Sequence, residues 1–135
     1  MDHTPLIVVV IIGVIIIIAI FIVATTSITS IPTTFFVTVS PTSSNLGYIV
    51  NNQIRPQLNL KRFSNYVFVV DEGTRNEPFY LTTSNTGGQG APGNFLNIVP
   101  VTNGKISFKP TQTTPSTFFY MSSNTPNYGG TITVS

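Results

Sequence analysis

The residues of this sequence that could do acid–base chemistry are three carboxylates close together in the chain. Asp71, Glu72 and Glu77 fall within one short segment, DEGTRNE. Carboxylate-dependent hydrolases use two carboxyl groups that face each other across a cleft. Here the acids surround Gly73 in a segment typical of a surface turn, where charged side chains are solvated. We therefore expect no catalytic pair from these residues and no enzymatic activity.

Cysteine and histidine, on which most metal sites and activated nucleophiles depend, are nearly absent from the sequence. The chain has no cysteine and a single histidine, His3, so zinc fingers, iron–sulfur centres, thiol catalysis and His-based triads lack their residues. A glycine-rich stretch at 85–93 could cradle a phosphate only if a helix began after it. The residues that follow, NFLNIV, have the composition of a strand. We interpret 85–93 as a surface loop and expect no cofactor and no resident metal.

The chain of 135 residues carries little charge. Charged residues make up 7% of it, and the formal net charge is +2, with the 6 Lys and Arg residues spread along the chain. This pattern does not fit the basic surface of a nucleic-acid binder, so we expect no nucleic-acid partner. Ser and Thr make up roughly a quarter of the residues, well above ordinary usage. Because the centres of protein interfaces are depleted in charge, this composition favours a domain packed among other proteins.

The first part of the sequence predicts a membrane anchor. The run from Leu6 to Ala24 contains only apolar residues. A helix of that length spans roughly 28 Å, close to the hydrocarbon thickness of a bilayer. A cleaved signal peptide is the alternative, but the preceding MDHTP has no Lys or Arg. We therefore predict a short N-terminal tail at 1–5, a single transmembrane helix in the lipid bilayer at 6–24, and a tether at 25–34.

Two features of the composition bear on the side of the membrane that the rest of the chain faces. The sequence is rich in Asn, Ser and Thr, yet it contains no Asn-x-Ser/Thr glycosylation acceptor, and it has no cysteine. Both features suit a domain that does not enter the secretory lumen. We expect the C-terminal domain to face a cytosol-like space, with the N-terminal tail across the membrane.

The sequence pattern changes at Phe35 to short runs of β-branched and aromatic residues, separated by clusters of Gly, Pro, Asn and Ser. Turn signals at this spacing are typical of an all-β sandwich. Alternation within runs such as VFVV and ISF gives each strand one face toward a core. We therefore predict an all-β domain over 35–135. Its expected strands are Phe35–Ser40, Tyr48–Asn51, Gln57–Lys61, Tyr66–Val70, Phe79–Thr83, Phe95–Val99, Lys105–Lys109, Thr117–Met121 and Thr131–Ser135.

Several ordered motifs of this region resemble the plastocyanin-like and amicyanin-like cupredoxins. The front half contains PQLNLKR at 56–62, YVF at 66–68 and EPFY at 77–80, similar to the family's P-x-L-x-L-x-R, Y-x-F and HPFY segments. The back half, PSTFFYMSSNTPNYGGTITV, is similar to the family's closing strand, ligand loop and last strand. The resemblance covers nearly all of 35–135 and implies a cupredoxin-like Greek-key β-sandwich.

Under this resemblance, all the copper ligands of the family are replaced. A blue-copper site needs a thiolate, two imidazoles and usually a weak axial methionine. The family's first His aligns with Glu77, and its Cys-x2-His-x2-Met loop aligns with Ser122, Thr125 and Tyr128. A protonated hydroxyl, a threonine and a tyrosine are not substitutes for those ligands. We expect these positions to bind no copper and to form a hydrogen-bonded remnant of the site, with a small polar ligand pocket as the alternative.

Plastocyanin-like domains of this motif style are similar to ones found in large DNA viruses, where an internal membrane lies beneath an icosahedral capsid. The resemblance, the anchor and the low charge together predict a non-catalytic, single-pass membrane protein of the virion. On this interpretation it is a minor capsid protein that links the internal membrane to other capsid proteins through its β-sandwich. The alternative is a membrane-anchored binding module, at a cell surface or in a periplasm, that uses the former metal pocket. In neither case is the chain a copper electron carrier.

Overall fold

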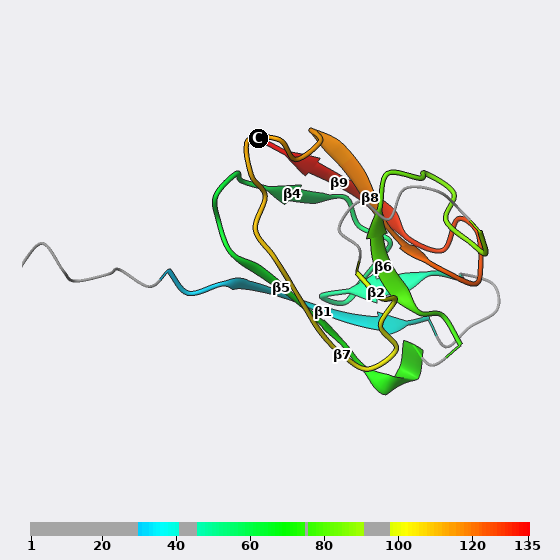
Figure 1. Ribbon diagram of the computed structural model, residues 1–135. Coiled ribbons are helices and arrows are strands. Elements are labelled where there is room, and N and C mark those ends of the chain that lie inside the picture. The colour runs from blue at the N-terminus through cyan, green and yellow to red at the C-terminus, as the bar shows by residue number, and fades with distance from the viewer. Residues whose placement is uncertain (1–29, 41–45, 75, 91–97) are drawn as a thin grey trace, which may run out of the picture.

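The computed structural model describes residues 30–40, 46–74, 76–90 and 98–135, and these form a β-rich domain (Figure 1). No α-helix occurs among the described residues, and a single 3-10 turn, η2 (Glu72–Thr74), follows β5. The prediction of a β domain is thus confirmed for this part of the chain. The strands are β1 (Thr33–Val39), β2 (Tyr48–Val50), β3 (Gln53–Ile54), β4 (Leu58–Leu60), β5 (Tyr66–Val70), β6 (Phe79–Thr82), β7 (Gly104–Phe108), β8 (Thr117–Ser122) and β9 (Gly130–Val134).

The first sheet has the strand order β3-β2-β1-β5-β7. β1 and β5 run parallel, from Thr33 beside Tyr66 to Val37 beside Val70, and the other pairs of this sheet are antiparallel. Parallel neighbours cannot be joined by a tight hairpin. The chain accordingly passes through β4 of the other sheet between β1 and β5.

The second sheet has the strand order β4-β9-β8-β6 and lies above the first in Figure 1. It is also mixed, because β4 and β9 are parallel while β8 pairs antiparallel with both β9 and β6. The register of β6 and β8 sets Phe79 opposite Ser122. This register brings the residues just before β6 to the end of β8, although they are far apart in the sequence.

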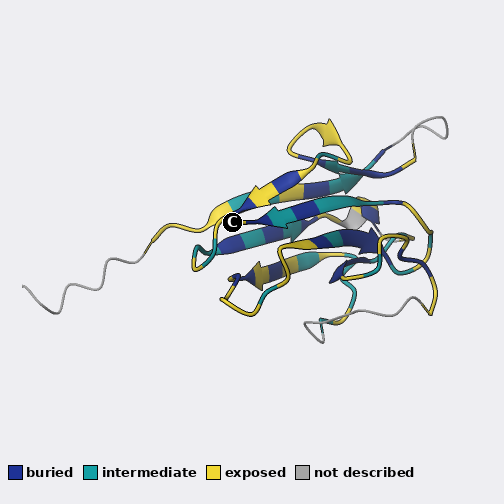
Figure 2. Cartoon of the chain, turned by 90° about the horizontal axis from the view of Figure 1, so that it is seen from above, coloured by how far each residue is buried: buried dark blue, intermediate teal, exposed yellow. Residues whose placement is uncertain are grey.

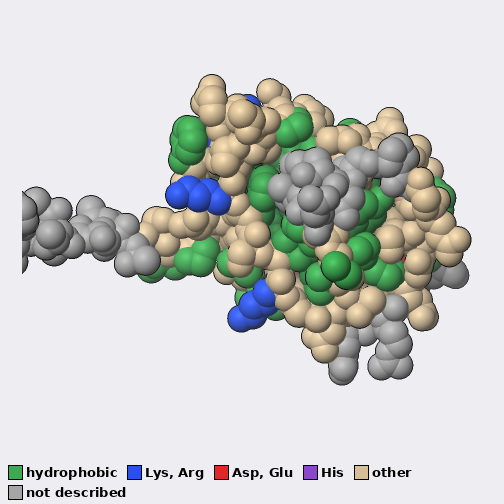
Figure 3. Space-filling model, in the orientation of Figure 1, with side chains coloured by type: hydrophobic (Ala, Val, Ile, Leu, Met, Phe, Trp, Pro, Cys, Tyr) green, Lys and Arg blue, Asp and Glu red, His purple; other side chains and the backbone are tan. Residues whose placement is uncertain are grey.

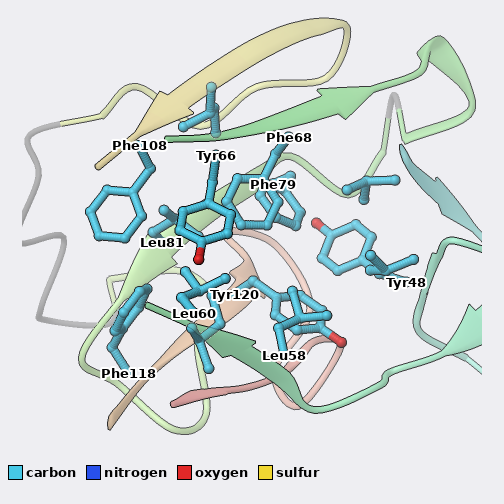
Figure 4. Close-up of a cluster of buried hydrophobic side chains, with 14 of the residues drawn as sticks. Tyr48, Leu58, Leu60, Tyr66, Phe68, Phe79, Leu81, Phe108, Phe118 and Tyr120 are labelled. Atoms are coloured by element: carbon cyan, nitrogen blue, oxygen red, sulfur yellow. The ribbon is translucent and has the colours of Figure 1, made fainter. Parts of the chain in front are cut away.

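The hydrophobic core lies between the two sheets. Along β5, buried residues alternate with half-buried ones, and the strands in Figure 2 show the same banding. Figure 4 shows buried side chains of both sheets pointing toward one another. The ring centroids of Phe68 (β5) and Phe79 (β6) are 5.5 Å apart, as are those of Phe108 (β7) and Phe118 (β8). At such separations an aromatic pair adds about 0.5–1.5 kcal/mol beyond its buried area, so these rings stabilise the contact between the sheets.

The short strand β3 is absent from the strands predicted above. It forms a hairpin with β2 through Asn51 and Asn52, whose φ angles are 47° and 66°. Two successive left-handed residues are the signature of a type I′ hairpin turn, and Asn tolerates that conformation better than most residues. The Asn51 side chain also accepts a hydrogen bond from the backbone N–H of Phe36 at 2.9 Å. The turn is thus held against β1.

The other predicted strands overlap observed strands, except for Phe95–Val99. Their ends differ by at most about two residues, as is usual where strand ends fray. Of the expected strand Phe95–Val99, residues 95–97 lie outside the described residues, and Ile98 and Val99 are not in a strand. Beside them, Val101 forms a single antiparallel bridge with Phe79 at the edge of β6.

The predicted tail at 1–5, the predicted helix at 6–24 and the tether as far as residue 29 lie outside the described residues. Within the described ranges, no helix has the length and apolar character needed to cross a bilayer. β1 begins at Thr33, two residues before the predicted start of the β domain at Phe35.

Gly129, at the turn before β9, leads to a prediction on stability. A Cβ at this position would overlap the backbone carbonyl oxygen of Tyr120, whereas Gly90, with φ at +70°, has nothing within 4 Å of its Cβ position. Gly129→Ala should therefore lower the free energy of unfolding by about 3 kcal/mol or more, because the backbone has to move. Gly90→Ala should lower it by about 1–2 kcal/mol, the strain of the left-handed backbone alone.

The measurement is thermal unfolding of the full chain in detergent micelles, followed by near-ultraviolet circular dichroism. Equal losses for the two variants would contradict the requirement for space at Gly129.

Candidate functional site

The four positions that the resemblance aligns with copper ligands lie at one end of the domain, where β6 begins and β8 ends. Glu77 precedes β6, Ser122 is the last residue of β8, and Thr125 and Tyr128 lie in the loop between β8 and β9. The antiparallel pairing of β6 with β8 brings Glu77 next to Ser122. Backbone bonding continues past the strands, since the N–H of Ser123 donates to the carbonyl oxygen of Pro78 at 3.0 Å.

The Glu77 carboxylate is the centre of this site, and both of its oxygens accept a hydrogen bond. The hydroxyl of Ser122 donates to Oε2 at 2.6 Å, and the hydroxyl of Thr125 donates to Oε1 at 2.7 Å. Hydrogen bonds to an ionised acceptor are shorter and stronger than those between neutral groups. We call Glu77, Ser122 and Thr125 the carboxylate cluster.

Ser122 also fixes the backbone of the loop that follows it. Its fully buried Oγ accepts hydrogen bonds from the backbone N–H groups of Asn124, at 3.0 Å, and Thr125, at 3.2 Å. The side chain of Asn124 donates to the carbonyl oxygen of Asn76 at 2.8 Å. The same few residues therefore satisfy the carboxylate and close the loop over it.

Tyr48 connects the carboxylate cluster to the core. Its buried ring lies 5.2 Å from that of Phe79 and 5.1 Å from that of Tyr128, centroid to centroid, and both pairs are edge-on. Its hydroxyl donates to the backbone carbonyl oxygen of Glu77 at 2.7 Å. Tyr128 thus packs on Tyr48 beside the cluster, while Ser122 and Thr125 bond the carboxylate itself.

Burial controls the ionisation of these phenols. Desolvation raises the pKa of Tyr48 far above its usual 10.0, a hydrogen bond with Ser122 opposes this, and the charge of Glu77 adds to it. Desolvation and the charge of Glu77 also raise the pKa of Tyr128, and a backbone hydrogen bond with Gly47 lowers it. Both phenols therefore stay protonated over the physiological range, and the Tyr48 hydroxyl acts there as a hydrogen-bond donor.

The described part of the glycine-rich stretch, residues 85–90, packs on this end of the domain. The described part includes the buried Gly87 and Gly88, whose φ angles are 64° and 85°. The N–H of Gly88 donates to the backbone oxygen of Ser122 at 2.8 Å, and the N–H of Asn127 donates to the backbone oxygen of Thr86 at 2.6 Å. Composition alone did not reveal this role. The adjacent pair Gly87–Gly88 is the sequence signal that could have indicated a close approach of two backbone segments.

The three neighbouring acids have separate surroundings. Asp71 accepts a hydrogen bond from the N–H of Gly73 at 2.9 Å and so caps the turn η2, in which Glu72 lies. Glu77 instead bonds the hydroxyls of Ser122 and Thr125. Asp71 thus stabilises the turn η2, whereas Glu77 bonds the loop after β8.

The chemistry open to the carboxylate cluster is limited by its own hydrogen bonds. Within the described ranges, no group of three or more His, Cys, Asp or Glu residues could hold a metal ion. Every buried side-chain nitrogen or oxygen described there has a hydrogen-bond partner. Within the cluster, the hydroxyls of Ser122 and Thr125 thus occupy part of the acceptor capacity of the carboxylate. Comparison of the chain with protein-family models, curated proteins and solved structures finds no match in any of the three.

A groove of about 530 Å³ lies elsewhere, on the outer face of the first sheet. Its most exposed aromatic residue is Phe36 of β1, 62% of whose surface is accessible. This groove was not foreseen from the sequence, because Phe36 was expected only as part of an alternating strand. Its walls come from β1, β2 and β5 with the turns beside them, and are formed by Thr34, Phe36, Val37, Thr38, Ile49, Asn51, Asn52, Val69 and Asp71.

Removal of the Ser122 hydroxyl tests the role of the cluster. Ser122→Ala leaves one carboxylate oxygen and two backbone N–H groups without their partner, so we expect the free energy of unfolding to fall by about 1–3 kcal/mol. Thermal unfolding of the full chain in detergent measures this loss. The control is Ser107→Ala, which removes an exposed hydroxyl from β7 and should change stability little. Equal stability of the two variants would show that the cluster contributes nothing to folding.

The buried Tyr48 predicts the alkaline behaviour of the protein. Its pKa is raised in the folded state, so its contribution is fully present below pH 10, where the unfolded phenol also keeps its proton. Above that pH the unfolded state releases a proton that the folded state retains, and stability falls by about 1.4 kcal/mol per pH unit. Tyr48→Phe should make this decline shallower by that amount. Unfolding midpoints measured between neutral and strongly alkaline pH test it, and an unchanged slope would exclude Tyr48 as the cause.

Proposed function

We propose that this chain is a non-catalytic structural protein that joins a membrane to a protein shell. It has a membrane anchor at 6–24 and a cupredoxin-like Greek-key β-sandwich that has lost its copper site. The observation that carries the proposal is the Glu77 carboxylate, whose two oxygens are both taken by hydroxyls of the same chain. A domain with such a cluster at the former ligand positions is suited to docking rather than to electron transfer or hydrolysis.

The arrangement of the aligned positions supports the cupredoxin relationship. Ser122 and Thr125 lie 45 and 48 residues from Glu77 in the sequence, yet both hydrogen-bond to it. The resemblance requires this proximity, because the aligned ligands would share one copper ion. The two mixed sheets suit the same architecture. The donor set does not suit copper, since it lacks a thiolate and an imidazole.

The surface supports docking to other proteins. The face in Figure 3 is largely uncharged, with hydrophobic side chains gathered around the position of β6 in Figure 1. On the first sheet, the groove beside Phe36 adds an apolar surface that a partner can fill. We infer that a shell protein with an uncharged, apolar surface occupies this groove. The anchor, the low charge and the plastocyanin-like motifs all fit the virion of a large DNA virus. In that setting the chain is a minor capsid protein.

A membrane-anchored binding module is the alternative function. A ligand at the former metal pocket would have to share Glu77 with Ser122 and Thr125, which already donate to both carboxylate oxygens. The hydrogen-bonded cluster therefore favours the structural proposal.

Cross-linking of the intact source particle or membrane with a lysine-reactive reagent tests the proposal. Lys105 is exposed on β7 and pairs with Val69, which lines the groove, so their side chains share the outer face of the first sheet. We expect repeated links from Lys105 to one abundant shell protein. Links from this chain only to itself would contradict docking and favour a free-standing binding module.

A matched pair of variants locates the docking surface. Phe36→Ser removes the exposed aromatic side chain beside the groove and should reduce the Lys105 links several-fold while the melting temperature stays near that of the parent. Val99→Ser alters a residue that is 79% exposed and outside the groove, and it should leave the links unchanged. Equal loss of links in both variants would exclude the groove as the docking surface.

A further inference from the structure

One end of the domain receives the N-terminal segment, and several separate parts of the chain meet there (Figure 1). The N–H of Thr33 donates to the backbone oxygen of Asn65 at 2.9 Å, and the Asn65 side chain donates to the Ser30 hydroxyl at 3.0 Å. The N–H of Phe63 donates to the backbone oxygen of Pro110 at 2.7 Å. We call this region, made of residues 30–33, 61–65 and 109–114, the anchor-side end.

Charge is distributed unevenly between the two ends of the domain. Lys61, Arg62 and Lys109 lie at the anchor-side end, and the two lysines are exposed. The acidic side chains that the structure describes, Asp71 and Glu77, belong to the turns at the opposite end. That end also holds one described cation, Arg55, which donates to the backbone oxygen of Asn127 at 3.3 Å. In Figure 3 the visible Lys and Arg side chains lie in the left half of the view. The anchor-side end is therefore cationic.

Arg62 organises the anchor-side end as well as contributing charge. Its guanidinium donates to the backbone oxygens of Thr111 at 2.6 Å and Thr114 at 2.9 Å. These bonds hold the loop after β7 against the loop after β4. They also keep the charge of Arg62 on the same surface as Lys61 and Lys109.

Phe63 is held in an unusual conformation at the tip of this surface. Its φ angle is 64°, and 59% of its surface is exposed. A left-handed backbone is rare for a bulky residue and has to be maintained by its surroundings. The exposed ring of Phe63 thus follows directly after Lys61 and Arg62 in the chain. Aromatic and basic side chains together are typical of surfaces at the headgroup level of a membrane.

The chain length brings this surface close to the predicted bilayer. Ser30 is six residues after Ala24, where the predicted span ends, so an extended chain reaches at most about 20 Å. Because Ser30 bonds Asn65, the loop that contains Phe63 lies within that reach. We propose that the anchor-side end binds anionic lipid headgroups of the bilayer that holds the anchor, with Phe63 at headgroup depth. This inference rests on the membrane anchor of the proposed function and adds a fixed orientation of the domain on the membrane.

A single tryptophan makes the contact measurable, because the chain contains none. The full chain with Phe63→Trp is reconstituted into vesicles of phosphatidylcholine, alone or mixed with phosphatidylserine, that carry a brominated phospholipid as quencher. We expect blue-shifted emission and strong quenching, both greater with phosphatidylserine. Val99→Trp, also in an exposed position, provides the reference for a residue away from the anchor-side end and should show little quenching.

Two lysine variants in the Phe63→Trp chain test the electrostatic part with the same loss of charge. Lys61→Gln should weaken docking about fivefold in the phosphatidylserine vesicles, and added salt should weaken it further. Lys105→Gln removes a charge from β7, away from the proposed contact, and should leave the quenching unchanged. Equal effects of the two variants would overturn headgroup binding by the anchor-side end.

The outcomes separate this inference from the anchor itself. The vesicles are washed with alkaline carbonate. If this wash releases the chain, the membrane anchor is overturned, and headgroup binding with it. If the chain resists extraction but the Phe63→Trp variant is quenched no more than the Val99→Trp variant, headgroup binding alone is overturned. Quenching that does not depend on phosphatidylserine would also overturn it.

Discussion

The half-buried Glu77 carboxylate takes its described hydrogen-bond donors from neutral hydroxyls, and this interaction shapes one end of the domain. The donors are the hydroxyls of Ser122 and Thr125. Ser122 reaches Glu77 from the end of β8, whereas Thr125 reaches it because the loop after β8 turns back toward the start of β6. The backbone N–H bonds to Ser122 maintain that turn. The conformation of the loop and the hydrogen bonding of the carboxylate thus depend on each other.

Tyr48 extends this dependence into the core. It belongs to β2 of the first sheet, yet its hydroxyl bonds the backbone of Glu77, beside the second sheet, and its ring packs on Phe79 and Tyr128. A displacement of the carboxylate cluster would therefore disturb both sheets. In a protein that uses a site for chemistry, the reactive group has to reach its substrate. Here the polar groups face one another, so the site contributes to the rigidity of the domain.

Most strands could be predicted because their residues alternate between core and surface, as in the YVFVV of β5. The β2–β3 hairpin was missed because its second strand is short, although the Asn51–Asn52 pair is a recognisable turn signal. Within the site, the aligned motifs anticipated which residues meet, but the hydrogen bonds of Glu77 depend on loop geometry that no local pattern encodes. The packing of Gly87 and Gly88 against the end of β8 is likewise not encoded by a local pattern. It joins segments that are distant in sequence, and composition alone suggested only a surface loop.

The two ends of the domain have different chemistry, and this difference gives the proposed linker a direction. The anchor-side end carries cations and an exposed aromatic ring, which suit a headgroup surface. The opposite end has its carboxylate hydrogen-bonded by hydroxyls, and the outer face of the first sheet is apolar around Phe36. A rigid domain held at one end by charge presents its uncharged faces at a defined distance from the membrane. Because apolar docking surfaces act only at contact, whereas charge acts over about a Debye length, orientation by the lipid would precede and assist recognition by the shell.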